Sequence, residues 1–130
     1  MIDPPLILIV DDVVETRGLM RRILERSAFR VIEAASGEEG LRAIEKDRPK
    51  LVVLDLRLPG ISGFDVARAI RSNVDAAIAG TVLLACSASV QPEVQREAIE
   101  AGCNAFEGKP FDIFAFPERV RGLIAQHPRF

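Results

Sequence analysis

The chain has 130 residues, a length that suits one domain built around one hydrophobic core. Its net charge is −2 and its basic residues are scattered, so it lacks the basic footprint that binds nucleic acid regardless of sequence. No apolar run approaches the roughly 18 residues of a membrane span, and the N-terminus lacks a signal-peptide pattern. We therefore expect a cytoplasmic protein that binds neither nucleic acid nor membranes.

Apolar runs alternate with helical patterns along the whole chain. The apolar runs predict strands at residues 6–10, 29–34, 51–54, 81–86 and 104–107. Helical spacing and capping signals predict helices at residues 13–27, 37–48, 62–71 and 91–101, and from about residue 117 onward. Residues 72–80 are expected to form a loop, in which residues 76–79 could add a turn of helix.

This strand–helix alternation predicts an α/β fold with a doubly wound parallel sheet and helices on both faces. Sheets of this size commonly have the strand order 2-1-3-4-5, with a crevice where the order reverses between strands one and three. The expected architecture is therefore a five-stranded, flavodoxin-like sheet flanked by five helices.

Polar side chains follow four of the five predicted strands. Asp11 and Asp12 end the first strand, Asp55 ends the third, Ser87 follows the fourth and Lys109 follows the fifth. Because parallel strands end at one edge of the sheet, we expect these distant residues to meet in one crevice. An alternative for Asp55 alone is a capping or turn residue at a strand end.

Such a crevice has the chemistry of a phosphoryl receptor. Three neighbouring carboxylates repel one another, so at least one carboxyl pKa should rise in the empty site, and a hard cation such as Mg²⁺ would relieve the repulsion. Lys109 supplies a positive charge, Ser87 a hydroxyl, and the small Ala88 an approachable backbone N–H. A nucleophilic carboxylate surrounded by these groups could carry a phosphoryl group.

Four motifs carry a family resemblance: Asp11-Asp12, Asp55 followed by Pro59 and Gly63, Ser87-Ala88, and Lys109-Pro110. In this order and at these separations they resemble the receiver domain of two-component response regulators, over about residues 6–125. The resemblance implies a single, stand-alone receiver domain spanning residues 1–130.

The resemblance also implies residue roles. Asp55 would accept a phosphoryl group from the histidine of a sensor kinase or a histidine phosphotransfer protein. Asp12, Asp55 and the backbone carbonyl of Arg57 would hold Mg²⁺, with Asp11 assisting through water. Lys109 would pair with the phosphoryl oxygens and precede a cis peptide bond.

Further roles concern switching and lifetime. By similarity, Ser87 would move to meet the phosphoryl group, aided by the Ala88 N–H. Phe106 occupies the place of the switch aromatic, although a plain core role is an equal alternative. Arg57 and Ser89, each two residues after a reactive residue, stand where receiver domains tune phosphoryl lifetime.

Output is expected to pass through protein contacts, because the chain ends about one helix after Lys109. The expected surface consists of the helix at 91–101, the strand at 104–107 and the last helix. The domain would be a signalling module, not an enzyme, beyond its own phosphoryl transfer and dephosphorylation.

Two other functions compete with this interpretation. One is a receiver-like adaptor that signals without phosphorylation. The other is a small hydrolase of the haloacid dehalogenase type, which also uses an aspartate after a strand, but that family places a second aspartate where this chain has Arg57. A flavin-binding module is disfavoured because Asp11 and Asp12 would face the flavin phosphate.

Overall fold

A computed structural model describes residues 3–127. The elements, in chain order, are β1 (Leu6–Val10), α1 (Val14–Arg26), β2 (Arg30–Ala34), α2 (Gly37–Asp47), β3 (Leu51–Asp55), α3 (Gly63–Arg71), α4 (Ala76–Ala79), β4 (Val82–Ser87), α5 (Pro92–Glu100), β5 (Ala105–Gly108) and α6 (Phe116–Gln126). Within the described residues, no helix has the length and apolar character needed to cross a bilayer.

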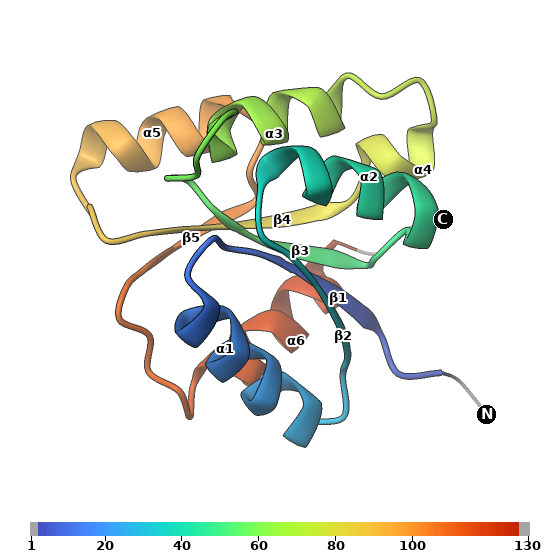
Figure 1. The fold of residues 1–130 in the computed structure, drawn as a ribbon, viewed down its shortest axis with the longest axis vertical. Coiled ribbons are helices and arrows are strands. Elements are labelled where there is room, and N and C mark those ends of the chain that lie inside the picture. The colour runs from blue at the N-terminus through green and yellow to red at the C-terminus, as the bar shows by residue number, and fades with distance from the viewer. Residues whose placement is uncertain (1–2, 128–130) are drawn as a thin grey trace.

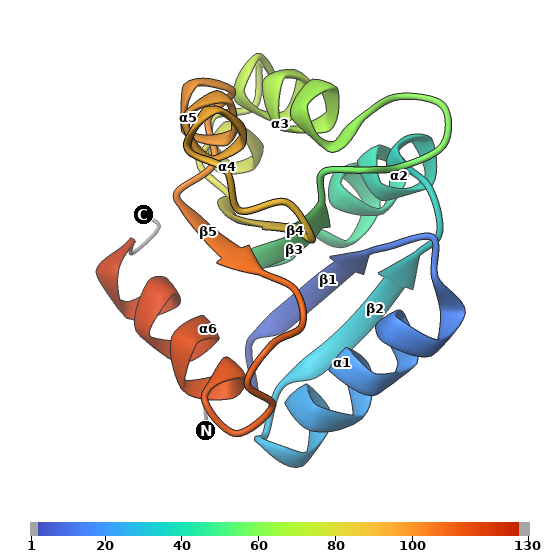
Figure 2. The same cartoon turned by 90° about the vertical axis from the view of Figure 1, so that its left-hand side faces the viewer.

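The five strands form one parallel sheet in the order β2-β1-β3-β4-β5, which confirms the predicted topology. Helices α1 and α6 cover one face of this sheet, and α2, α3, α4 and α5 cover the other (Figures 1 and 2). The order reverses beside β1, so β1 and β3 are neighbours although their first residues, Leu6 and Leu51, are 45 positions apart in the chain. All five strands end at the same edge.

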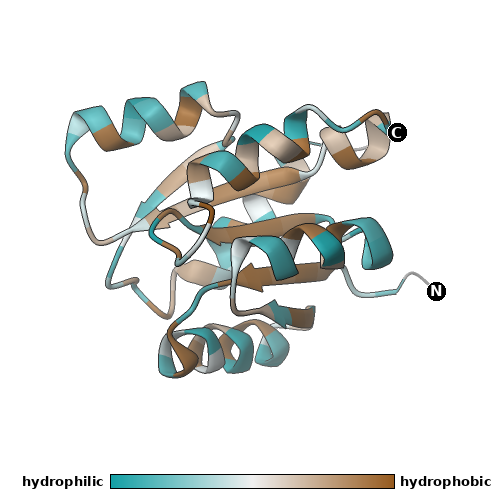
Figure 3. Cartoon of the chain, turned by 45° about the horizontal axis from the view of Figure 1, so that its top comes forward, coloured by the Kyte–Doolittle hydropathy of each residue, from teal (hydrophilic) through white to brown (hydrophobic). Residues whose placement is uncertain are grey.

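The two faces of the sheet bury two separate hydrophobic clusters. Along β1, Ile7 and Ile9 pack toward α1 and α6, whereas Leu8 and Val10 pack toward α2, α3 and α5. All four side chains are fully buried. Burial on both faces explains why the central strands are continuous apolar runs and not alternating patterns, and the hydropathy colouring shows these brown strands between helices with teal outer faces (Figure 3).

Most predicted elements are confirmed, and their ends differ by one or two residues. Ser36 begins α2 as expected, since its hydroxyl accepts a hydrogen bond from the Glu39 N–H at 3.1 Å. The last helix begins at Phe116, next to the expected Pro117. Asp112 does not cap this helix but accepts hydrogen bonds from the turn before it, at the N–H groups of Phe114 and Ala115.

One expectation needs correction, because the described residues hold six helices and not five. The additional helix is α4, a single turn within the segment expected to be a loop. The Asp75 carboxylate accepts a hydrogen bond from the Ala77 N–H at 2.9 Å, and Ile78 is 1% exposed. The cap and this buried side chain stabilise the turn of helix that was considered as an alternative at residues 76–79.

Candidate functional site

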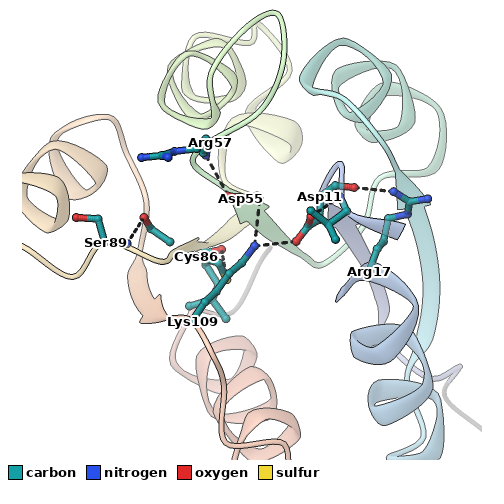
Figure 4. A network of polar contacts seen from close by, with 10 residues as sticks. Asp11, Arg17, Asp55, Arg57, Cys86, Ser89 and Lys109 are labelled. Carbon is teal, nitrogen blue, oxygen red and sulfur yellow. Dashed lines mark hydrogen bonds and ion pairs between the residues drawn. The ribbon is translucent and has the colours of Figure 1, made fainter. Parts of the chain in front are cut away.

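The carboxyl edge of the sheet brings together the residues that were predicted to meet there. Lys109 Nζ donates to Asp11 Oδ2 at 2.9 Å and to Asp55 Oδ2 at 3.1 Å. Asp11, Asp12 and Asp55 each place one carboxylate oxygen within 4.8 Å of the others. Figure 4 shows Lys109 reaching from the end of β5 to the ends of β3 and β1. The predicted convergence is therefore confirmed, although it leaves the chemical roles of these side chains to experiment.

Hydrogen bonds restrain both the backbone N–H of Asp11 and the two oxygens of its carboxylate. Its N–H donates to the Ala34 carbonyl at 3.1 Å, and its Oδ1 accepts from the Val13 N–H at 2.8 Å. With Lys109 on Oδ2, the side chain is 1% exposed yet fully paired. A buried carboxylate is tolerated only with such partners, so Asp11 is a rigid part of the site.

Asp55 lies at the end of β3, where a glycine allows the chain to pass close behind it. The Arg57 N–H donates to Asp55 Oδ1 at 3.0 Å, and the Gly63 N–H donates to the Leu56 carbonyl at 3.0 Å. A Cβ on Gly63 would lie 2.3 Å from the Asp55 carbonyl oxygen and 2.6 Å from the Leu56 Cα. Only glycine fits there, and α3 can therefore begin directly against the strand that carries Asp55.

The pKa of one site carboxyl, that of Asp55, is raised as predicted, but the main cause is burial and not repulsion between the carboxylates. Burial raises the pKa of the Asp55 carboxyl above its usual value, against the lowering by the Arg57 N–H and Lys109, and the repulsion from Asp11 is the smallest contribution. Burial also acts to lower the pKa of Lys109, but its hydrogen bonds to both carboxylates outweigh burial and the pKa is raised. Desolvation therefore contributes more than carboxylate repulsion to the raised pKa of Asp55.

Asp12 differs from its two acidic neighbours because it is exposed and unpaired. Within residues 3–127, its side chain has no hydrogen-bond or ion-pair partner. The donor set therefore consists of three carboxylates, and two of them, those of Asp12 and Asp55, line a depression open to water. Oxygen ligands with room for several waters suit Mg²⁺ better than a closed cage would. The residues present fit such a cation.

The remaining predicted residues line a depression of about 260 Å³ above the carboxylates. Its walls are formed by Asp12, Val13, Asp55, Arg57, Ser87, Ala88, Ser89 and Lys109. Ser87 Oγ accepts a hydrogen bond from the Ser89 N–H at 3.1 Å, and Arg57 and Ala88 are exposed at the rim. Lys109 precedes a cis peptide bond, as expected. Every predicted site residue except Asp11 and Phe106 therefore borders this depression, and Asp11 lies buried behind it, paired with Lys109.

Phe106 lies apart from that depression. It is on β5, opposite Ala85 of β4, and it is partly buried against the cluster on the α2 to α5 side of the sheet. Its role as a switch aromatic stays a prediction, and its position also suits a plain core residue.

Sequence reasoning missed Arg17. Its guanidinium donates to the Asp11 carbonyl and to Glu33 of β2, both at 2.7 Å. Arg21 donates to the same Glu33 carboxylate at 2.6 Å. The only signal in the sequence was the four-residue spacing of the two arginines, which cannot reveal a partner on another strand.

Comparison with known proteins decides the family. The sequence matches the response regulator receiver domain over residues 7–121. The chain belongs to this family. Its fold, with the predicted strand order, is that of a receiver domain of two-component response regulators.

Individual relatives agree with this assignment. The receiver domain is 34% identical over 125 residues to the transcriptional regulatory protein AfsQ1 of Streptomyces coelicolor, covering 96% of this chain and 53% of that protein. It is also 34% identical over 104 residues to the sensor histidine kinase AruS of Pseudomonas aeruginosa, covering 80% of this chain and 10% of that protein. A solved putative response regulator from Chloroflexus aurantiacus superimposes with a TM-score of 0.88 at 30% identity, covering 94% of this chain and 98% of that one. This chain therefore spans about half or less of these two curated relatives.

Proposed function

We propose that this receiver domain accepts a phosphoryl group on Asp55 in a Mg²⁺-dependent reaction. The observation that supports this most strongly is the pairing of Lys109 Nζ with two carboxylates that share a 4.8 Å cluster with a third. Such a cluster supplies a nucleophile, a cation site and a fixed positive charge in one crevice. The donor would be the phosphohistidine of a sensor kinase or of a histidine phosphotransfer protein.

In the proposed transfer, an Asp55 carboxylate oxygen attacks phosphorus. A phosphorus–oxygen bond forms while the phosphorus–nitrogen bond to the donor histidine breaks, and the imidazole nitrogen keeps the bonding electrons. Asp12, Asp55 and the Arg57 carbonyl would hold Mg²⁺, with Asp11 acting through water. When bound, the cation neutralises charge that develops on the phosphoryl oxygens. Lys109 would leave Asp55 Oδ2 to pair with one of those oxygens.

Two further donors would complete the phosphoryl site. Ser87 would turn its hydroxyl toward one phosphoryl oxygen, giving up the hydrogen bond it now accepts from the Ser89 N–H. The backbone N–H of Ala88 would meet another oxygen. Phe106 would follow the movement of Ser87, and Arg57 and Ser89, both at the mouth, would tune the lifetime of the phosphoryl group.

Output would follow as a shift between two surface conformations. We propose that α5, β5 and α6 form the surface that contacts a downstream protein, and that the domain acts in the cytoplasm without binding nucleic acid or membranes itself. Within α5, Ala98 is buried and Val94 is partly buried against the same cluster. A helix with few buried apolar side chains can move at a small free-energy cost.

The test is labelling with a small acyl phosphate such as acetyl phosphate, in the presence and absence of Mg²⁺. The parent protein should gain one phosphoryl group per chain only with Mg²⁺, and Asp55→Asn should gain none. The matched control is Asp47→Asn, at the exposed end of α2, which should label like the parent. Equal labelling of Asp55→Asn and the parent would show that the acceptor is misassigned.

A phosphorylation-independent adaptor predicts a different outcome. Titration with Mg²⁺ and beryllofluoride, a phosphoryl mimic, would then leave the amide signals near Ser87 and Phe106 unchanged. The phosphoryl-accepting function predicts that both regions shift together.

A further inference from the structure

Arg17 links the end of β1 to the neighbouring strand β2. Its Nη1 donates to the Asp11 carbonyl and its Nε donates to Glu33 Oε1, both at 2.7 Å. Its side chain is only 14% exposed. Glu33 is itself held, because its second oxygen accepts from Arg21 at 2.6 Å. The guanidinium is therefore fixed between β2 and the loop that follows β1. Figure 4 shows its bond to the Asp11 carbonyl.

The bond to the Asp11 carbonyl acts directly on Asp12. That carbonyl belongs to the planar peptide that joins Asp11 to Asp12, so holding the oxygen fixes the orientation of the whole unit. Asp11 is restrained in three other places, whereas the Asp12 side chain has no partner within residues 3–127. The backbone of Asp12 therefore directs its carboxylate relative to those of Asp11 and Asp55. Arg17 restrains that backbone through the Asp11 carbonyl.

We propose that Arg17, braced by Glu33, is a positioning residue that aligns Asp12 with Asp11 and Asp55 for cation binding. The proposal rests on the Mg²⁺ site of the proposed function. Arg17 contacts neither cation nor phosphoryl group, and it acts through the peptide before Asp12. Groups that orient metal ligands in this way change metal affinity by about 10- to 100-fold when removed.

A purely electrostatic role for the same pair predicts a different pattern. Arg17 is positive, so its removal would strengthen the attraction of the carboxylates for a cation. Glu33 is negative, so its removal would weaken that attraction. Positioning instead predicts that loss of either partner weakens binding, because each is needed to hold the Asp11 carbonyl.

The experiment measures Mg²⁺ affinity by amide chemical-shift titration of the whole chain. We expect Arg17→Ala and Glu33→Ala each to weaken Mg²⁺ binding about tenfold, and the double variant to be no weaker than either. The matched control is Arg21→Ala, which removes a guanidinium from the same Glu33 carboxylate but leaves the Asp11 carbonyl held. It should bind Mg²⁺ within about twofold of the parent.

A second readout does not depend on Mg²⁺. In Arg17→Ala, the Asp11 carbonyl carbon and the Asp12 amide should shift in the metal-free protein, whereas in Arg21→Ala they should not. Should Arg17→Ala fail to fold, Arg17→Lys keeps the charge but lacks the planar fork that reaches both acceptors, and weaker binding is again expected.

The outcomes separate this proposal from the one it rests on. Tighter or unchanged Mg²⁺ binding by Arg17→Ala, in a parent protein that binds Mg²⁺ and labels at Asp55, overturns the positioning role alone. A parent protein that neither responds to Mg²⁺ nor labels overturns the proposed function itself.

Discussion

Replacing Lys109 with methionine tests the electrostatic core of the site. The substitution keeps an unbranched stem of similar length but removes the ammonium group that pairs with two carboxylates. Asp11 and Asp55 are 1% and 8% exposed, so water can replace the lost partner only in part. A hydrogen bond to a charged group contributes about 1.5–3 kcal/mol, and breaking a buried ion pair costs about 3–5 kcal/mol. We expect Lys109→Met to lower the free energy of unfolding by about 3 kcal/mol near pH 7.

The pH dependence of that loss follows from the same contacts. Without Lys109, the pKa of a buried carboxyl in the folded state rises above its value in the unfolded chain. A raised carboxyl pKa in the folded state means that stability increases as the pH falls, by up to about 1.4 kcal/mol per pH unit for one proton. The deficit of Lys109→Met should therefore shrink between about pH 7 and pH 5. Mg²⁺ should also restore part of the stability that Lys109→Met loses, because the cation neutralises the same carboxylates.

The assay is urea denaturation of the parent, Lys109→Met and a matched control at both pH values, with and without Mg²⁺. The control is Lys46→Met, on the exposed face of α2, whose effect should stay within about 0.5 kcal/mol. If Lys109→Met matches this control, Lys109 does not stabilise the buried carboxylates and the electrostatic reasoning is refuted.

Two further predictions concern Asp55 and the glycines. Asp55→Asn should be more stable than the parent near neutral pH, because burial raises the pKa of Asp55 and an amide carries no charge to desolvate. This advantage should disappear as the pH is lowered and Asp55 itself becomes neutral; a urea series from about pH 7 to pH 4 that shows a constant difference would contradict it. Gly63→Ala should lose about 1–3 kcal/mol, since its Cβ would lie 2.3 Å from a backbone oxygen. Gly122→Ala, in α6 with nothing within 4 Å, should gain about 0.5–1 kcal/mol; equal thermal shifts for the two glycine variants would show that the close approach at Gly63 is unimportant.

Local sequence patterns were sufficient to predict the strands, the main helices and the order of the strands in the sheet. The central strands are buried on both faces, so apolar runs such as residues 6–10 and 51–54 mark them without ambiguity. Their alternation with helical patterns leaves few topologies, and the chain adopts a common one. The convergence of Asp11, Asp55 and Lys109 follows from that topology, because parallel strands end at one edge. It could be predicted without coordinates for this reason.

The burial of individual side chains and their particular contacts with other elements could not be predicted from sequence. The main cause of the Asp55 pKa shift is burial, which only the packed structure reveals. The sequence allowed a turn of helix at residues 76–79 but could not decide it, because the segment is too short for a periodic pattern and the turn depends on burial of Ile78. The contact between Arg17 and Glu33 joins a helix to a strand, and no local pattern encodes it. Sequence by itself thus determined which reactive groups reach the edge of the sheet. Tertiary packing alone decided how they are desolvated, paired and held, because those properties arise from contacts between elements and not within them.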